Sequence, residues 1–250
     1  GHPIGDRVLV RVAGCLRAVE LLIREKSIGA VGLPDPSRAL MSPEGLCGVA
    51  DDLSVGTMME AYGRGLYPSA HFGLMKWWAP AHRAIVAPAA LSNWLYESVQ
   101  SHCFDADVVF DRNFEAAVCD DKEAPQIPPR LKWAFARLFD AGFAHSFDVI
   151  SAAGERVGGG FGVAVGRVFV IESMHYKDRA ALEAGLAGLA RGLDERGFAW
   201  IDAKRLTPEL ARCGFDETPR VGYIARLKAS LGHEKAGRWS RPLREVGRAA

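Results

Sequence analysis

The stretch between residues 144 and 174 leaves this chain little choice of local structure. Three β-type runs, 144–152, 157–165 and 167–174, follow one another there. They are separated only by the tripeptide Ala153-Gly154-Glu155 and by Gly166. Connections this short join antiparallel neighbours of one sheet. The sequence therefore predicts an antiparallel meander in the second half of the chain.

Helical patterns flank this meander on both sides. A helix is expected from 130 to 141, ending at Gly142, and a longer one from 178 to 195, ending at Gly197. Leucines at 182, 186, 189 and 193 place an apolar face on the longer helix. A strand at 198–203 and helices at 208–213 and 221–231 follow. We therefore expect the α+β class, with helices packed on a mixed, mainly antiparallel sheet.

A charged, proline-rich stretch at 120–129 divides the chain. It suggests a leader of unknown role at 1–42, a small N-terminal α/β domain at 43–124, a catalytic domain at 125–232 and a basic tail at 233–250. Within the small domain, Ser54 is placed to begin a helix, and short strands are expected around Trp77-Trp78 and at 84–86. Another helix is expected at 91–99, a strand at 107–110 and a short helix at 113–119.

The overall charge argues against a surface built entirely to hold nucleic acid. The 250 residues include 31 Lys and Arg and 30 Asp and Glu, a formal net charge of +1, whereas such proteins are usually far more basic. From Arg220 onward, however, eight basic residues stand against Glu234 and Glu245. That local excess is typical either of a phosphate-binding patch or of a solvated tail.

The cysteines and histidines argue against a disulfide-stabilised protein and against a metal-binding protein. The five cysteines form no C-x-x-C pair, and the histidines form no cluster with them. We therefore expect neither a disulfide framework nor a metal site. The scattered cysteines also indicate that the protein works in a reducing compartment. With no apolar run of about 18 residues, the sequence predicts a cytoplasmic protein with no membrane span.

Candidate catalytic side chains stand at the ends of two apolar strands. Glu172 and Ser173 close the third run of the meander, and Asp202 ends the strand Ala199–Ile201. Lys204 lies two residues after Asp202 and so on the same face. Carboxylates at such positions are held rigidly at the edge of a cleft. Alternatively, Asp202 and Lys204 form an ordinary ion pair and Glu172 caps the following helix.

Two further features each allow two interpretations. Gly158–Gly160 and Gly162 lie inside a β run, which excludes a phosphate loop and favours a bulge or the close approach of a ligand or a neighbouring backbone. Trp77-Trp78, near Arg83, could stack on a nucleobase or fill a core.

Taken in order, these motifs resemble the bacterial leucyl/phenylalanyl-tRNA-protein transferases. The resemblance runs from about residue 43 to Tyr223 and consists of several short segments with similar spacing. They are Pro43–Leu46, Asp52–Ser54, Ala61–Tyr62 with Gly65–Pro68, Trp77–Pro80 with Arg83, Gly142–Val149, Val157–Val163, Glu172–Met174 and Ile201–Lys204.

The resemblance implies a small N-terminal domain, a C-terminal GNAT-like acyltransferase domain and a reaction without metal or other cofactor. The amino group of an acceptor protein bearing N-terminal Arg or Lys would attack the ester of an aminoacyl-tRNA carrying Leu, Phe or Met. Glu172 matches an active-site glutamate, and Asp202 an aspartate of a proton relay. The apolar pocket for the donor side chain would be built by Phe169, Leu186, Leu189 and Ile201, whose alternative role is core packing. Ser173, Gly160, Trp77 and Trp78 complete the expected substrate-binding set.

The chain departs from the family pattern at four places. Lys204 stands where the family has a glutamine, and Ser69 and Gln126 fall at or near two family tryptophans that face the terminal adenosine. The segment 91–100, which corresponds to a basic helix that contacts tRNA, holds no Lys or Arg.

The leading hypothesis is a diverged aminoacyltransferase. Glu172 would bind or orient the acceptor, Asp202 would help to deprotonate it, and Lys204 would pair with these carboxylates or stabilise the oxyanion. One alternative is a GNAT-like acyltransferase with a donor other than tRNA, although 176–182 lacks the pyrophosphate loop that coenzyme A requires. The other alternative is a non-catalytic binding protein.

Overall fold

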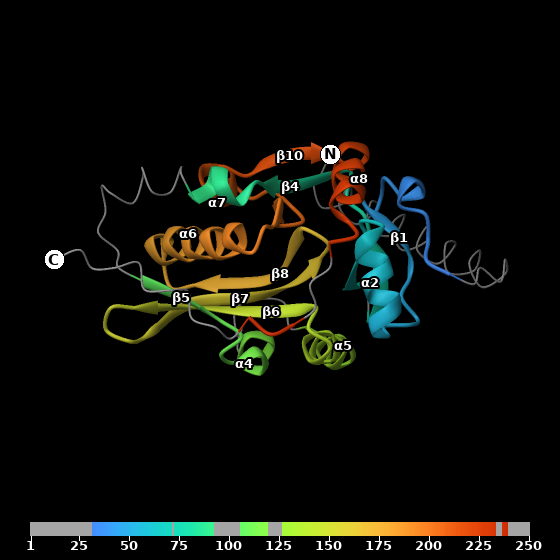
Figure 1. The fold of residues 1–250 in the computed structure, drawn as a ribbon. Coiled ribbons are helices and arrows are strands. Elements are labelled where there is room, and N and C mark those ends of the chain that lie inside the picture. Colours follow the sequence, from blue (N-terminus) through green and yellow to red (C-terminus); the bar gives the residue numbers. More distant parts are fainter. Residues whose placement is uncertain (1–31, 72, 93–105, 120–126, 234–236, 240–250) are drawn as a thin grey trace, which may run out of the picture. The chain divides into compact units, whose positions relative to one another are not determined.

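A computed structural model describes residues 32–71, 73–92, 106–119, 127–233 and 237–239 (Figure 1). The chain divides into two compact units, residues 1–81 and 82–250. The predicted leader lies largely outside the described residues, as do Gln126, most of the predicted helix at 91–99 and most of the basic tail.

The first unit is built on a three-stranded antiparallel sheet. Its order is β1-β3-β2, formed by β1 (Leu46–Val49), β2 (Tyr67–His71) and β3 (Leu74–Trp78). Helix α2 (Val55–Gly63) begins as predicted, with the Ser54 side chain accepting a hydrogen bond from the Thr57 N–H. A 3₁₀ turn, η1 (Pro36–Arg38), precedes the sheet.

The second unit contains a seven-stranded sheet in the order β10-β4-β9-β8-β7-β6-β5. Only β8 and β9 pair in parallel, and the other neighbours are antiparallel. This arrangement confirms the meander and the mixed, mainly antiparallel α+β class. The strands are β4 (His82–Val86), β5 (Ala106–Phe110), β6 (Ala144–Ser151), β7 (Arg156–Val165), β8 (Val168–Tyr176), β9 (Trp200–Asp202) and β10 (Asp216–Pro219).

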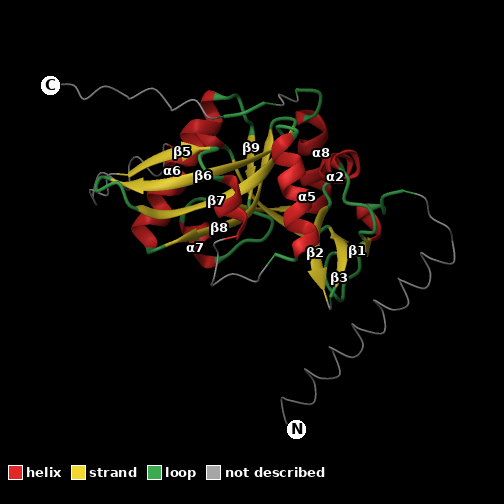
Figure 2. Ribbon diagram, turned by 90° about the horizontal axis from the view of Figure 1, so that it is seen from below, coloured by secondary structure: helices red, strands yellow, loops and turns green. Residues whose placement is uncertain are grey.

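Helices cover both faces of this sheet. Figure 1 shows α6 on one face and α4 with α5 on the other, and Figure 2 shows α5 from its own side. The helices are α4 (Phe114–Cys119), α5 (Pro129–Asp140), α6 (Arg179–Glu195), α7 (Pro208–Arg212) and α8 (Arg220–Ser230). No helix among the described residues is long and apolar enough to cross a membrane.

Helix α6 lies close to the sheet because its inner face carries glycine. A Cβ added to Gly188 would lie 2.3 Å from Val108 Cγ2, and one added to Gly192 would lie 2.5 Å from Phe110 Cε2. Larger residues would therefore push the helix off β5. The leucines predicted to share a face point the same way: Leu186, Leu189 and Leu193 are fully buried in the core beneath α6, and Leu182 is partly buried against it.

The chain divides into its two compact units at a different residue from the predicted domain boundary. The proline-rich stretch suggested a boundary between residues 124 and 125, whereas the two units meet between Ala81 and His82. Strand β4 pairs with β9 and β10, and β5 pairs with β6. The described residues 82–119 therefore complete the large sheet instead of a separate N-terminal domain.

Candidate active site

Strands β8 and β9 lie at the centre of the large sheet, and we call the place where their pairing ends the opening between them. Their parallel pairing ends at Val170 and Asp202, while β8 continues to Tyr176. On the other side of β8, Phe161 of β7 pairs with Ser173 and Gly162 pairs with Ile171. Glu172 is therefore the extra residue of a β-bulge. A bulge re-aims a side chain, and this one lies just beyond the last residue that β9 can pair.

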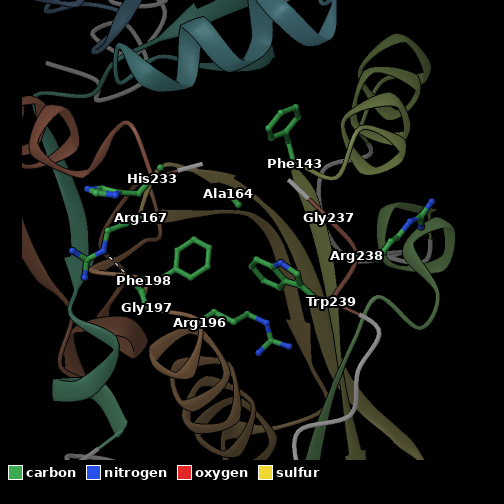
Figure 3. A pocket seen from close by; sticks show the side chains of 11 residues that line it. Phe143, Ala164, Arg167, Arg196, Gly197, Phe198, His233, Gly237, Arg238 and Trp239 are labelled. Atoms are coloured by element: carbon green, nitrogen blue, oxygen red, sulfur yellow. Dashed lines mark hydrogen bonds between the residues drawn. The ribbon is translucent and has the colours of Figure 1, made fainter. Parts of the chain in front are cut away.

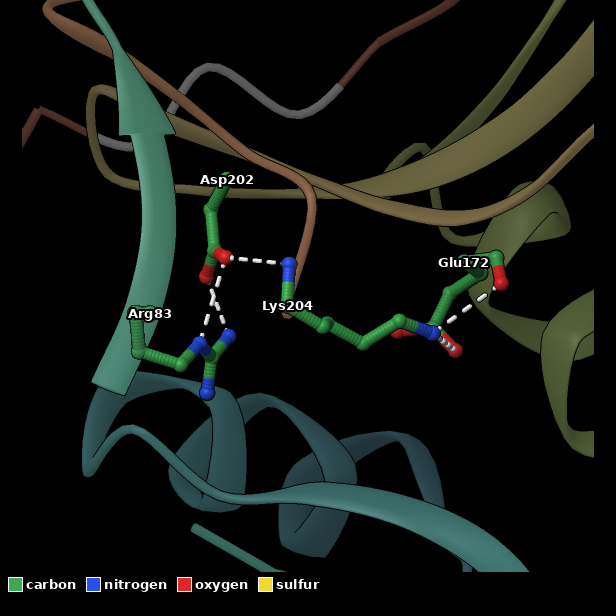
Figure 4. A network of polar contacts seen from close by, with 4 residues as sticks. All are labelled: Arg83, Glu172, Asp202 and Lys204. Atoms are coloured by element: carbon green, nitrogen blue, oxygen red, sulfur yellow. Dashed lines mark hydrogen bonds and ion pairs between the residues drawn. The ribbon is translucent and has the colours of Figure 1, made fainter. Parts of the chain in front are cut away.

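Asp202 is held at this point by an arginine from β4. Both side chains are buried, and Arg83 Nε donates to Asp202 Oδ1 at 3.2 Å. A second guanidinium N–H, on Nη2, donates to Oδ2, so the contact is bidentate (Figure 4). Bidentate pairs of this kind are strong and fix orientation. Asp202 is thereby locked in one position.

Lys204 crosses the opening from the end of β9 to the bulge. Its backbone N–H donates to Asp202 Oδ1 at 2.7 Å, and its Nζ donates to both the carbonyl oxygen and Oε2 of Glu172 at 3.0 Å (Figure 4). The backbone of Lys204 has φ of 64°, a left-handed conformation that is uncommon outside glycine. The surrounding hydrogen bonds hold it there, as is typical of functional sites.

The four charged side chains balance one another but differ in their access to solvent. Arg83, Asp202 and Glu172 are buried, whereas the side chain of Lys204 is 19% exposed. The Arg83 guanidinium also lies 4.4 Å from the centroid of the Tyr223 ring. Burial raises the pKa of Tyr223 well above its usual range, with a smaller contribution from Asp202, so the phenol stays neutral. The ammonium of Lys204 is therefore the member of this network best placed to meet a substrate.

The glycines of β7 let its neighbours approach closely beside the bulge. A Cβ on Gly160 would lie 2.2 Å from the Ser173 carbonyl oxygen, and one on Gly162 would lie 2.4 Å from that of Val170. Neither position has room for a side chain. These contacts confirm the sequence-based interpretation that the run permits close backbone approach.

Comparison with known proteins decides the family. A profile of the family described as leucyl/phenylalanyl-tRNA protein transferase matches residues 89–228. The leucyl/phenylalanyl-tRNA--protein transferase of Thiobacillus denitrificans is 33% identical over 216 residues, covering 82% of this chain and 92% of that protein. The chain belongs to the leucyl/phenylalanyl-tRNA-protein transferase family. The Nitrosospira multiformis protein of the same name is 35% identical, with the same coverage of both chains.

Solved structures add little to this assignment. That of L-PGS from Bacillus licheniformis is similar with 16% sequence identity and a TM-score of 0.34, covering 51% of this chain and 47% of that one. A structural similarity this weak supports no conclusion about the function of this chain.

The apolar residues expected to receive the donor side chain lie together in this family member. Phe169 and Ile201 come from the paired ends of β8 and β9, and Leu186 and Leu189 come from α6. All four are fully buried in one core cluster. Their burial agrees with the core-packing alternative, and their contact with a donor side chain stays a prediction.

The two tryptophans lie in the first unit of the transferase. Trp77 and Trp78 are both buried in β3, and the Trp78 indole N–H donates to the Ser69 carbonyl oxygen at 3.2 Å. This burial agrees with the core-filling alternative. Stacking of either ring on a nucleobase stays a prediction.

Arg83 belongs to one of the family-like segments of the sequence, but it was not among the predicted site residues. Arg83 and Asp202 are separated by 119 positions. They meet because β4 pairs with β9, with Ile85 opposite Asp202. The position of Asp202 at the end of an apolar strand was the signal that could have prompted a search for a distant arginine, because a buried carboxylate needs a charged partner.

A separate cavity lies at the opposite end of these strands. It has a volume of about 570 Å³ and is lined by, among others, Ala164, Arg196, Phe198 and Trp239 (Figure 3). The rings of Phe198 and Trp239 face its interior. None of Glu172, Asp202 and Lys204 lines it. Among the described residues, no cluster of His, Cys, Asp and Glu is arranged to hold a metal ion.

Proposed function

We propose that this chain transfers an aminoacyl group from aminoacyl-tRNA to the free amino group of an acceptor protein or peptide, at the opening between β8 and β9. Family membership over most of the chain supports the reaction. The observation that carries the site is the Lys204 ammonium held at the bulged Glu172.

The reaction needs alignment and proton transfer more than covalent help. The acceptor nitrogen forms a bond to the carbonyl carbon of the aminoacyl ester, and the bond from that carbon to the ribose oxygen breaks. One proton leaves the nitrogen, and one proton reaches the ribose oxygen. Because the ester is already activated, positioning the two reactants and moving this proton supply most of the rate enhancement.

Each charged residue then has a distinct role. Lys204 stabilises the negative charge that develops on the ester oxygen, since its ammonium is partly exposed and already oriented. Glu172 accepts a hydrogen bond from the acceptor amine and draws its proton. Asp202 is a positioning residue here, because its two oxygens already accept bonds from Arg83 and from the Lys204 N–H.

The proposed substrates are those of the family, and an apolar cluster beside β8 and β9 supports the choice of donor. The donor residue is Leu, Phe or Met, which matches the apolar character of Phe169, Leu186, Leu189 and Ile201. The acceptor is a protein or peptide with N-terminal Arg or Lys. Ser173 and Gly160, whose backbones approach closely beside the bulge, shape the wall that faces the reacting ester.

Replacing Lys204 tests this proposal. Full-length protein is incubated with charged total tRNA carrying radiolabelled amino acids and with Arg-, Lys- and Asp-initiated peptides. Wild type is expected to transfer Leu, Phe or Met to the first two, and Lys204→Ala to lower kcat on the order of 10²–10³-fold, as loss of an oxyanion donor does. Lys204→Gln, which restores the family residue, is expected to retain more activity than Lys204→Ala.

Exposed Lys177 supplies a matched control. Lys177→Ala removes the same charge outside the network and is expected to keep wild-type kcat, while cooperative thermal unfolding shows that each variant is folded. A fully active Lys204→Ala protein would contradict the role of Lys204. Binding of tRNA without transfer by wild type would instead favour a non-catalytic binding protein, and neither binding nor transfer would favour another acyl donor.

A further inference from the structure

The apolar wall proposed for the donor side chain is closed. Phe169, Leu186, Leu189 and Ile201 are each 0% exposed, and all four belong to one core cluster. A donor side chain therefore contacts them only after part of the wall moves. Protein interiors are close-packed and resist such movement unless free space lies nearby. The wall is therefore expected to give way beside a cavity.

Phe169 is the wall residue that adjoins such a space. Its ring centroid lies 6.3 Å from that of Phe198 and 5.7 Å from that of Trp239. These two rings also face the interior of the cavity of about 570 Å³ at the opposite end of the strands (Figure 3). Phe198 and Trp239 therefore link the wall to the cavity.

The sheet blocks movement of the Phe169 ring toward β7. A Cβ added to Gly162 would lie 2.7 Å from Phe169 Cζ, so the ring already lies directly on this glycine. The side of Phe198 and Trp239, by contrast, has free space behind it. Movement of Phe169 toward the cavity thus depends on how far these two rings can yield.

Trp239 is held firmly in the core. Its indole stacks on the His145 ring with centroids 3.6 Å apart and an angle of 4° between the planes. Its backbone N–H donates to Asp111 Oδ2 at 2.7 Å, and its side chain packs in the same cluster as the apolar wall. Trp239 therefore limits the movement of Phe169.

We propose that Trp239 determines the size of the donor side chain that the transferase accepts, by limiting how far Phe169 moves toward the cavity. This inference rests on the proposed function, which places the donor side chain against Phe169. Trp239 is a positioning residue, because it acts through Phe169. A phenylalanyl side chain is bulkier than a leucyl side chain and needs a larger movement of the wall. Trp239 therefore sets the ratio of Phe transfer to Leu transfer.

The test compares two donors on the same protein preparation. Full-length protein is incubated with leucyl-tRNA or phenylalanyl-tRNA and an Arg-initiated peptide, and kcat/KM for Phe is divided by kcat/KM for Leu. Both donors meet the same folded fraction of enzyme, so a loss of folded protein cancels from this ratio. Trp239→Leu is expected to raise the ratio about tenfold, the lower end of what one methylene group changes in an apolar pocket. The change is expected in KM, because the Lys204 network is untouched.

Ala164 allows a change of opposite sign. It lines the cavity and pairs with Phe169 across β7 and β8. Ala164→Leu fills space that Phe169, Phe198 and Trp239 would otherwise use and is expected to lower the ratio several-fold. Both variants disturb the packing of the core, so a merely structural role would not move the ratio in opposite directions.

Two variants serve as controls. Trp239→Phe keeps an aromatic ring beside Phe169 and is expected to shift the ratio less than Trp239→Leu does. Phe114→Leu removes a buried ring from a separate aromatic cluster on the other face of the sheet and is expected to lower stability without changing the ratio. If Trp239→Leu does not fold, Phe198→Leu tests the second ring, with a rise in the ratio expected.

Three results would overturn the inference. These are an unchanged ratio in Trp239→Leu and Ala164→Leu, shifts of the same sign in both, or an equal shift in Phe114→Leu, which would show that any loss of packing changes the ratio. If wild type transfers neither residue, the proposed function fails instead. The affinities of the two charged tRNAs then replace kcat/KM, and the same opposite shifts decide the role of Trp239.

Discussion

Two buried aspartates of the large unit solve the same physical problem in different ways. Asp202 and Asp111 both have fully buried side chains, and each accepts three hydrogen bonds from residues that the structure describes. A buried carboxylate is costly unless its oxygens are satisfied. What differs is the nature of the donors.

Asp202 is satisfied by charge. Two of its bonds come from the Arg83 guanidinium, and the third comes from the backbone of Lys204. The network continues through the Lys204 ammonium to Glu172 and ends at a partly exposed cation. Such an arrangement fixes charges where a reaction can use them.

Asp111 is satisfied by groups that tie chain segments together. Its Oδ1 accepts from the Ser146 N–H at 3.1 Å, and its Oδ2 contacts His145 Nδ1 at 2.9 Å and accepts from the Trp239 N–H at 2.7 Å. The His145 and Trp239 rings stack with centroids 3.6 Å apart. Asp111 thus anchors a C-terminal residue to the end of β5 and to β6. The comparison teaches that satisfying a buried charge can build a site, where the network reaches a partly exposed cation, or a structural tie, where the donors belong to separate chain segments.

The largest effect is expected from breaking the charged pair. Arg83→Met leaves Asp202 buried without its guanidinium and is expected to lower the free energy of unfolding by about 3–5 kcal/mol, measured by urea denaturation. Adding Asp202→Asn removes the stranded charge, so the double variant is expected to recover part of that loss. A loss below about 1 kcal/mol in Arg83→Met would show that the pair does not hold this end of the sheet.

A smaller effect is expected from breaking the tie. Asp111→Ala leaves the N–H groups of Ser146 and Trp239 without their acceptor and is expected to cost about 2–3 kcal/mol in urea denaturation. Because Asp111 is not part of the Lys204 network, kcat per folded molecule is expected to stay at the wild-type level. Asp107→Ala, an exposed position on the same strand, is the control, with a change within about 0.5 kcal/mol. Loss of kcat in folded Asp111→Ala would erase the distinction between the two aspartates.

The regular elements around both aspartates could be predicted from the sequence. Alternating and helical apolar patterns gave β6, β7, β8 and α6 within a few residues of their observed bounds. Among the short strands, β3, β4, β5 and β9 were predicted, whereas β2 and β10 were missed because they lack such patterns. In β10 only Thr218 is buried, and β2 contains Pro68, a residue that usually argues against a strand.

The candidate site could be predicted only in part. Asp202 ends β9 and Lys204 follows it, which a local pattern reveals, whereas Glu172 was expected to close its strand and instead lies at a bulge within β8. Arg83 joins them, and Trp239 joins Asp111, only through contacts 119 and 128 positions apart in the chain. Such pairs depend on strand order and register, which local patterns do not specify. The bulge at Glu172 likewise follows from pairing with β7 and not from any residue type.

The smallest effect is expected at Ser146, where backbone and side chain play opposite parts in the tie. Its N–H donates to Asp111, whereas its buried hydroxyl has no hydrogen-bond partner among the described residues. Ser146→Ala keeps the N–H and removes a hydroxyl that makes no bond, so the free energy of unfolding is expected to change by less than about 0.5 kcal/mol. Urea denaturation beside Asp111→Ala measures the contrast. A loss comparable to that of Asp111→Ala would mean that the hydroxyl contributes to the tie, and that Asp111 acts through more than the three groups seen here.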